Sequence, residues 1–279
     1  MDAIQEPDML DMKQFLTLDL TTDEATTLVF VQTTFSDCGG VAVGLCFLHK
    51  IANFTSIMAF LNTWAATCQG ETKVSRFSFD LASYFPSREL GGFDLWGFLK
   101  FEEKLATKRF VFDEEKLAAL KQVASSSSVK DPTRVEVVSA FIWKHFMEVA
   151  KSKNPEVEKT FAAFHVVNLR TRKIPPQVLE NVFGNCLMVP FALSCNTEYE
   201  GVEDLDDLTS KLRSMIRSIN NEYIEKSQSG DCYLNNMFSL APAVLKRELD
   251  WCVFSSWCGF PTYRVDYGET DLGSTAAGL

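Results

Sequence analysis

A long stretch without hydrophobic periodicity, residues 78–106, divides the sequence into two parts. It contains residues that end helices and strands, namely Pro86, Gly91, Gly92 and Gly97. Connections of this length usually link folded parts or carry function. We therefore expect two domains in this chain of 279 residues, at 1–78 and 107–279, joined by a crossover loop at 79–106.

The first part predicts two strands and a helix. Residues 27–35 and 41–49 are rich in β-branched and aromatic residues, and the Ser-Asp-Cys-Gly-Gly between them supplies turn residues, so we expect a hairpin. Alternation places His49 at the end of the second strand, on its more apolar face. A helix is expected at 57–68, where apolar residues recur at helical spacing. Three residues before it are candidate N-caps: Asn53, Thr55 and Ser56.

The second part also mixes helices and strands. Helices are predicted at 113–124, from Thr133 to about Lys151, and from Val202 to about Lys226. Thr133 to Glu136 has the form of a capping box, and the helix that it opens is apolar nearly all round, which predicts burial. Strands are predicted at 108–112, 161–168, 185–194 and 251–257. The two parts together indicate an α/β chain, although these patterns do not determine the order of strands in a sheet.

Acidic residues outnumber basic ones, and the formal net charge is -10. Proteins that bind nucleic acid or acidic membranes usually carry a basic footprint, so neither partner is expected. The acidic segment Met1–Lys13 lacks the apolar core of a secretory signal, and the longest apolar run, Val41–Leu48, is too short to span a bilayer. These features predict a cytoplasmic protein.

The eight cysteines form no Cys-x-x-Cys pair, and no His-x-x-x-His accompanies them. We therefore expect no zinc site or other metal centre. Several cysteines lie inside apolar runs, as small core residues do. A reduced compartment fits this pattern, and a disulfide framework in a secreted chain is the alternative.

His49 is the first candidate for chemistry. Histidine moves protons near neutral pH, and a strand end followed by a turn and a helix can project it into a cleft. The alternative is a core histidine that is hydrogen-bonded to a backbone carbonyl. His145, in a predicted buried helix, and His165, in a predicted strand, are both expected to be structural. The sequence contains no Gly-x-Ser-x-Gly elbow, P-loop or dinucleotide fingerprint.

Three separated segments resemble, in order, the motifs of the BAHD family of plant acyl-CoA-dependent acyltransferases. They are HKIAN at 49–53, NLRTRKIPPQVLENVFGN at 168–185 and FSSWCGFPTYRVDYGET at 254–270. The resemblance extends from about Ala25 to Gly268 and is strongest to the alkaloid-acetylating, vinorine synthase-like branch. It implies a chloramphenicol acetyltransferase-like architecture. Two domains with mixed sheets and flanking helices are joined by a long crossover loop, and a solvent channel runs between them.

The resemblance also implies a reaction. His49 would be the general base, and the hydroxyl of an acceptor such as an alkaloid would attack the thioester of acyl-CoA, most simply acetyl-CoA. No permanently bound cofactor and no metal are implied, and the protein is expected to be a monomer. For acyl-CoA binding the resemblance points to the helix start at Thr133 and to Ser255, Ser256 and Trp257. The alternatives are an ordinary capping box at Thr133 and a strand with a buried tryptophan at 255–257.

Several positions differ from the family pattern. The family has aspartate where this chain has Asn53, and that aspartate pairs with an arginine, here Arg170 or Arg172. An amide can still accept a hydrogen bond from guanidinium, and Asn53 can also cap the helix. Phe54 replaces a glycine, which predicts strain if the turn needs a positive φ.

The last motif also departs from the family. Asp266 and Gly268 keep the family residues, and the resemblance implies a structural role for them. Glu269 replaces an aromatic residue, and Gly259 occupies the place of an arginine.

Two functions are compatible with these residues. The first is an acyl-CoA-dependent O-acyltransferase. The second is a catalytically impaired pseudoenzyme or truncated gene product that retains at most ligand or partner binding. Asn53, Phe54 and the altered last motif favour the second function. So does the expectation that both domains are incomplete at their outer ends, which would leave sheet edges uncovered.

Overall fold

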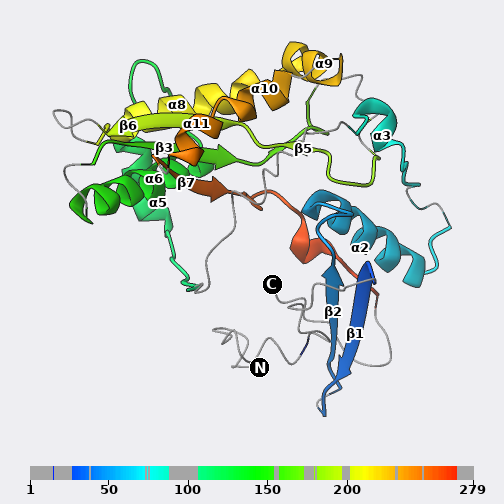
Figure 1. Cartoon of the computed structure of the whole chain (residues 1–279). Coiled ribbons are helices and arrows are strands. Elements are labelled where there is room, and N and C mark those ends of the chain that lie inside the picture. The colour runs from blue at the N-terminus through cyan, green and yellow to red at the C-terminus, as the bar shows by residue number, and fades with distance from the viewer. Residues whose placement is uncertain are drawn as a thin grey trace. The chain divides into compact units, whose positions relative to one another are not determined.

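The computed structural model describes residues 15, 27–37, 39–72, 74, 76–87, 106–153, 157–172, 179, 181–196, 202–229, 232–246 and 248–268. The chain divides into two compact units (Figure 1). Unit 1 contains Met1–Leu81, Gln177–Cys186 and Gly259–Leu279, and unit 2 contains Ala82–Pro176 and Leu187–Cys258. Unit 1 is therefore assembled from three separate stretches of the sequence. Most of the predicted crossover loop lies outside the described residues, and the domain bounds at 78 and 107 remain a prediction.

The chain contains both helices and strands, as expected for an α/β protein. In unit 1 they are β1 (Val29–Phe35), β2 (Val41–Phe47), α2 (Phe54–Cys68) and the 3-10 helix η2 (Thr262–Arg264). In unit 2 the helices are α5 (Glu114–Val123), α6 (Arg134–Lys153), α8 (Leu205–Ser218), α9 (Asn221–Ser229), α10 (Cys232–Phe238) and α11 (Ala241–Leu245). Its strands are β3 (Lys159–His165), β4 (Val167–Asn168), β5 (Leu187–Met188), β6 (Phe191–Asn196) and β7 (Leu249–Phe254). A further short helix, α3 (Leu81–Tyr84), begins where unit 1 gives way to unit 2.

Unit 1 contains the predicted hairpin. β1 and β2 pair antiparallel, from Val29 opposite Phe47 to Phe35 opposite Val41. Strand β2 ends at Phe47, so the prediction that His49 ends this strand was wrong. The reason is a turn: the N–H of Ile51 donates to the carbonyl of Leu48 at 3.0 Å, which carries His49 and Lys50 away from the ladder.

Helix α2 follows this turn and packs through aromatic contacts. Phe60 meets Phe47 of the hairpin edge-on, with ring centroids 5.6 Å apart. Trp64, one turn later, meets Tyr267 in the same geometry at 5.4 Å. Such edge-to-face pairs are favourable because the positive edge of one ring faces the negative face of the other. The hairpin and the segment that contains Tyr267 therefore both pack against α2 (Figure 1).

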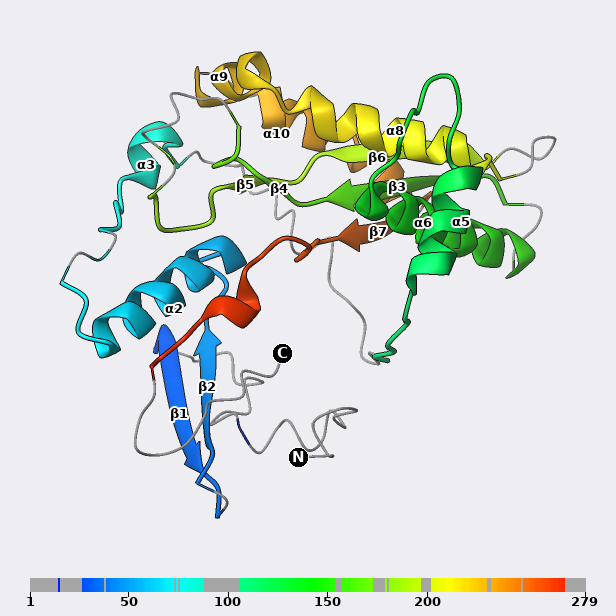
Figure 2. The same cartoon turned by 180° about the vertical axis from the view of Figure 1, so that it is seen from behind.

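Unit 2 is built on a three-stranded sheet in the order β6-β3-β7. The central strand β3 runs antiparallel to β6 and parallel to β7. Alternate residues of β3 enter two different cores, because successive side chains point to opposite faces. Phe161 and Ala163 join the core formed with α6 and α8, while Ala162 and Phe164 join the core formed with α10 and α11. The strand is thus buried on both faces, and the helices on either side can be followed in Figures 1 and 2.

Several predicted elements of unit 2 differ in the structure, among them the strand predicted at 185–194, which is the two strands β5 and β6. Residues 108–112 form no strand, because no strand in the described part of the chain pairs with them. The helix predicted from Val202 is two helices, because Ile219 leaves helical backbone with ψ 69° after α8 ends. The strand predicted at 161–168 is interrupted at Val166, whose N–H donates to Phe254 at 2.9 Å.

Helix α6 is also less buried than its sequence predicted. Its fully buried residues, including Trp143 and Met147, share one face, while Ile142 and Val149 are exposed. His145 lies on the exposed part, and its Nδ1 lies 2.8 Å from the carbonyl of Phe141.

Candidate active site

His49 is exposed in the turn between β2 and α2. Its main chain is held in place from a distant part of the sequence: Nδ2 of Asn185 donates to the carbonyl of His49 at 2.7 Å. Segment 181–186 belongs to the same unit as His49. The histidine backbone is therefore anchored while its imidazole stays accessible to solvent, an arrangement that suits a group exchanging protons with a substrate.

Segment 181–186 also binds the start of α2. The N–H of Gly184 donates to Oγ of Ser56 at 3.1 Å, and the carbonyl of Gly184 lies 3.0 Å from the same Oγ. Ser56 Oγ also lies 3.3 Å from Oδ1 of Asn53, so its single hydrogen is shared between two acceptors. Sequence reasoning missed Ser56, Gly184 and Asn185 as parts of this corner. The signal was available in the Phe-Gly-Asn that ends the second motif, but nothing local showed what it contacts.

Asn53 is the N-cap of α2. Its Oδ1 accepts the N–H of Ser56 at 3.2 Å, and its side chain is buried. Among the three candidate caps, the structure therefore selects Asn53. This geometry gives the amide a function that needs no charge, because a neutral oxygen caps a helix as well as a carboxylate does.

Exchange of Asn53 should separate capping from charge pairing. We expect Asn53→Ala to reduce the free energy of unfolding by about 0.5–2 kcal/mol, the usual effect of losing a cap. Asn53→Asp should stay within about 1 kcal/mol of the wild type, because aspartate caps equally well. Urea unfolding measures both. An alanine variant as stable as the wild type would contradict the capping role.

Gly184 occupies a backbone conformation that other residues rarely adopt. Its φ is 138°, and a Cβ placed there would lie 3.0 Å from Cδ2 of Leu81. A side chain at this position would therefore meet both backbone strain and a close contact.

Gly184→Ala should lower the free energy of unfolding by about 1–3 kcal/mol through backbone strain alone. The matched control is Gly70→Ala. Gly70 also has a positive φ, 81°, but apart from its two chain neighbours no described residue has an atom within 4 Å of the place that a Cβ would take. Denaturant unfolding should rank Gly184→Ala as the less stable variant, and the reverse order would contradict a tightly packed corner.

The strain expected at Phe54 is absent. Phe54 is the first residue of α2, and in the described part of the chain Asp131 is the one non-glycine residue with a positive φ. The ring of Phe54 packs edge-on against Phe260, with centroids 5.0 Å apart. The neighbouring Gly259 has φ 99°, a conformation in which an arginine would be strained.

Asp266 and Gly268 form a small turn against the end of α2. Oδ1 of Asp266 accepts the N–H of Gly268 at 2.8 Å, and the carbonyl of Asp266 accepts a hydrogen bond from Nε2 of Gln69 at 2.5 Å. Gly268 has φ 81°, and an added Cβ would lie 3.1 Å from Cγ of Gln69. These contacts are local and lie within unit 1, as a shape-keeping role requires.

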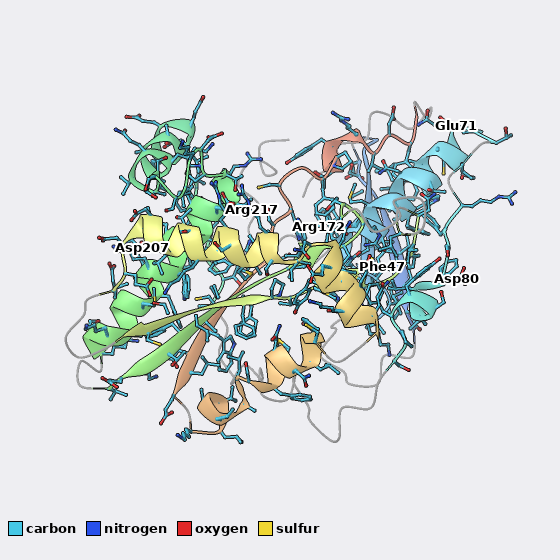
Figure 3. All side chains as sticks on the ribbon, turned by 90° about the horizontal axis from the view of Figure 1, so that it is seen from above. Phe47, Glu71, Asp80, Arg172, Asp207 and Arg217 are labelled. Carbon is cyan, nitrogen blue, oxygen red and sulfur yellow. The ribbon has the colours of Figure 1, made fainter. Side chains whose placement is uncertain are left out.

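Arg170 and Arg172 lie in a tight turn of unit 2 after β4. Oδ1 of Asn168 accepts the N–H of Arg170 at 3.1 Å, and the N–H of Arg172 donates to Leu169 at 3.0 Å. Nη2 of Arg172 approaches the carbonyl of Ile216 at 3.4 Å, next to α8 (Figure 3). Pairing of Asn53 with either arginine remains a prediction.

The predicted capping box at Thr133 is present. Oγ1 of Thr133 accepts the N–H of Glu136 at 3.2 Å, and Oε2 of Glu136 accepts the N–H of Thr133 at 2.8 Å. The hydroxyl accepts in this bond, so its own hydrogen is still available to donate. Burial alone would raise the pKa of Glu136, but hydrogen bonds from Arg213 and Thr133 outweigh it and hold the pKa below its usual value.

Ser255, Ser256 and Trp257 follow β7, which ends at Phe254 and not at residue 257 as predicted. Trp257 is therefore not a buried strand residue: 54% of its surface is exposed. Phe254 itself stands opposite His165 in the parallel ladder. Burial lowers the pKa of His165 and favours its neutral form, so this histidine has the structural character expected of it.

Membrane spans and metal clusters are both absent from the residues that the structure describes. No helix there is both long enough and apolar enough to cross a bilayer. No three histidine, cysteine or acidic side chains in the same part of the chain gather into a metal-binding group.

The fold resembles that of two solved structures, vinorine synthase and TRI101. Against the crystal structure of vinorine synthase the TM-score is 0.63 at 31% sequence identity, covering 86% of this chain and 53% of that one. Against F. sporotrichioides TRI101 complexed with Coenzyme A and T-2 the TM-score is 0.57 at 16% identity, covering 96% of this chain and 66% of that one, a likeness of fold alone. These neighbours confirm the expected class: a mixed α/β protein with the chloramphenicol acetyltransferase-like architecture.

Sequence comparison agrees. The Transferase family matches residues 4–271. Stemmadenine O-acetyltransferase of Catharanthus roseus is 40% identical, with 83% of this chain and 52% of that protein covered. Vinorine synthase of Rauvolfia serpentina is 35% identical, with 85% and 53% covered. The chain belongs to the Transferase family, that of the BAHD acyltransferases, and spans about half the length of these two relatives.

Proposed function

We propose that this protein transfers an acyl group from acyl-CoA to a hydroxyl of a plant specialised metabolite, with His49 as general base. The observation that carries the proposal is the corner itself. An exposed imidazole stands on a main chain that Asn185 anchors, directly before a helix capped by Asn53. The names of two relatives, stemmadenine O-acetyltransferase and limonoid 1-O-acetyltransferase of Citrus sinensis, support acetyl transfer to oxygen.

In the proposed reaction His49 accepts the proton of the acceptor hydroxyl as its oxygen attacks the thioester carbonyl. The tetrahedral oxyanion then collapses, the carbon–sulfur bond breaks, and the CoA thiolate takes a proton from the imidazolium. A base that is held within hydrogen-bond reach of the hydroxyl contributes both proton transfer and positioning. Acetyl-CoA is the proposed acyl donor and an alkaloid alcohol the proposed acceptor.

Other residues have supporting roles in this proposal. Thr133, Ser255, Ser256 and Trp257 would contact acyl-CoA, while Asp266 and Gly268 keep the shape of the last motif. The dipole of α6 favours a phosphate near its N-terminal end at Thr133. Asn53 would orient the corner, with Arg170 or Arg172 as its partner. We propose that the protein works as a monomer in the cytoplasm.

The deciding experiment measures CoA release from acetyl-CoA by the purified chain, with and without a panel of alkaloid and limonoid alcohols. Acceptor-dependent CoA release and the matching ester in a mass spectrum are the expected results. Thermal unfolding with CoA should accompany the assay, because a ligand at a hundredfold over its Kd stabilises by about 2.7 kcal/mol. CoA binding without turnover would favour the alternative, a catalytically impaired pseudoenzyme. Absence of both CoA binding and turnover would refute the proposal.

A further inference from the structure

One side chain fixes the peptide bond that follows His49. Nδ2 of Asn185 donates to the His49 carbonyl at 2.7 Å. Two backbone bonds of 3.0 Å hold the turn around it, from the N–H of Leu48 to Leu28 and from the N–H of Ile51 to Leu48. Neither of them ends on His49. Among the residues that the structure describes, Asn185 therefore makes the one hydrogen bond to His49.

Asn185 is well placed to act as an anchor, because the segment that carries it is fixed on both sides. Gly184 is bound to Ser56 of α2 through both its N–H and its carbonyl. Cys186, on the other side, is 1% exposed. All of these residues belong to unit 1, as His49 does. A short side chain on a backbone held in this way has little freedom to follow a moving turn, so the turn takes its position from the segment.

Stability alone does not explain the amide at position 185. Its Oδ1 is buried and has no hydrogen-bond partner among the described residues. An unsatisfied buried acceptor lowers the free energy of unfolding, and native proteins keep few of them. An apolar side chain of similar size would remove this cost, but it would also remove the donor to His49. The amide is therefore explained by the bond that it makes to His49 and not by the stability of its own surroundings.

The direction of the His49 imidazole depends on this backbone bond, because no side-chain bond holds the ring in the described part of the chain. Preferred rotamers follow the backbone φ and ψ angles, so a carbonyl that is free to rotate would widen the range of directions in which the ring points. A general base must lie within hydrogen-bond reach of the proton that it accepts. A displacement of about 1 Å can lower the rate of such a step about a hundredfold.

We propose that Asn185 is a positioning residue that sets the direction of the His49 imidazole through the backbone carbonyl of His49. This inference rests on the proposed function, in which His49 is the general base. It assigns to Asn185 no contact with the acceptor or with acyl-CoA. Loss of Asn185 should therefore affect kcat and not substrate affinity.

The test compares two variants with a matched control. Asn185→Ala removes the donor, and Asn185→Asp keeps the shape but presents an ionised carboxylate, which has no hydrogen to donate. Asn62→Ala is the control, because Nδ2 of Asn62 donates to the carbonyl of Met58 at 2.8 Å, also in unit 1. It removes a bond of the same kind that does not involve His49. Steady-state kinetics give kcat and KM for each substrate, and thermal unfolding gives the folded fraction.

We expect both Asn185 variants to lower kcat about 10–100-fold, with KM for acetyl-CoA and for the acceptor unchanged and the control like the wild type. A folded Asn185→Ala protein with wild-type kcat would overturn the inference. If that variant does not fold, Asn185→Asp decides by the same criterion. Failure of both to fold would assign the amide to stability and reject the positioning role.

A second comparison separates positioning from a general effect on structure. In a His49→Ala background, Asn185→Ala should cause no further loss of kcat, because a residue that acts through the imidazole has nothing left to position. A further loss as large as in the wild-type background would reject the inference.

A measurement without turnover keeps this inference distinct from the proposed function. Nuclear magnetic resonance of the protein with isotope-labelled histidine gives the χ1 rotamer populations of His49, His145 and His165. We expect His49 to hold one rotamer in the wild type and to average over several in Asn185→Ala, with the other two histidines unchanged. Rotamer averaging of His49 in the wild type as well would overturn the inference. A wild-type protein without turnover would refute the proposed function, and these populations would then decide the role of Asn185 by themselves.

Discussion

Replacing His49 by alanine should lower kcat of acyl transfer by about 10²–10⁴-fold, the range contributed by a positioned general base. The fold should survive, because the imidazole is exposed and the bond from Asn185 ends on the backbone carbonyl, which alanine retains. Binding of CoA should change little, since the proposed contacts with CoA come from other residues. The measurement is initial-rate CoA release, together with a thermal unfolding scan of the same preparation.

His145→Ala is the matched control for this experiment. His145 is also exposed, but it lies on α6, where its ring packs against Phe141 with centroids 4.1 Å apart. Its loss should leave kcat unchanged. Full activity in His49→Ala would remove His49 from the mechanism, whereas equal losses in both variants would indicate a general effect on structure.

Replacing Trp143 by alanine should reduce the free energy of unfolding of unit 2 by about 3–5 kcal/mol. The indole is 0% exposed and lies in the core between α6, α8 and the sheet. Alanine removes most of its buried apolar area and leaves a cavity that the surrounding secondary structure cannot fill. Trp143→Phe should lose much less, because phenylalanine fills most of the volume and Nε1 of Trp143 has no hydrogen-bond partner to lose among the described residues.

Trp257→Ala serves as the stability control. Trp257 is 54% exposed, so its replacement should change the free energy of unfolding by about 0.5 kcal/mol or less. Urea unfolding followed by circular dichroism measures all three variants. Equal midpoints for Trp143→Ala and Trp257→Ala would mean that the core of unit 2 is not formed as described.

Local elements were predicted well where neighbouring residues provide all the bonds. The hairpin needed only two alternating strands around a glycine-containing turn. The caps Asn53 and Thr133 each accept the N–H of the residue three positions further along the chain. Residues 108–112 show the limit of such reasoning. Their composition favours a strand, but a strand also needs a partner, and none pairs with them in the described structure.

The candidate site was only half predictable. His49 and its motif were found from the sequence, but the turn that exposes the imidazole depends on where the hairpin ladder stops. The bond from Asn185 to His49 spans 136 positions, and the bonds from Arg213 to Glu136 span 77. Contacts between residues so far apart in the sequence leave no periodic pattern by which they could be predicted.

The sequence by itself determined the family, the α/β class, the histidine of the first motif and the capping box that opens α6. Each of these depends on residue types at short, fixed spacings, which a chain carries before it folds. Only the tertiary structure decided that segment 177–186 joins unit 1, that Gly184 and Asn185 hold the corner, and that Arg213 holds the loop before α6. These contacts exist because packing within each unit brings distant backbone carbonyls and amides within hydrogen-bond reach.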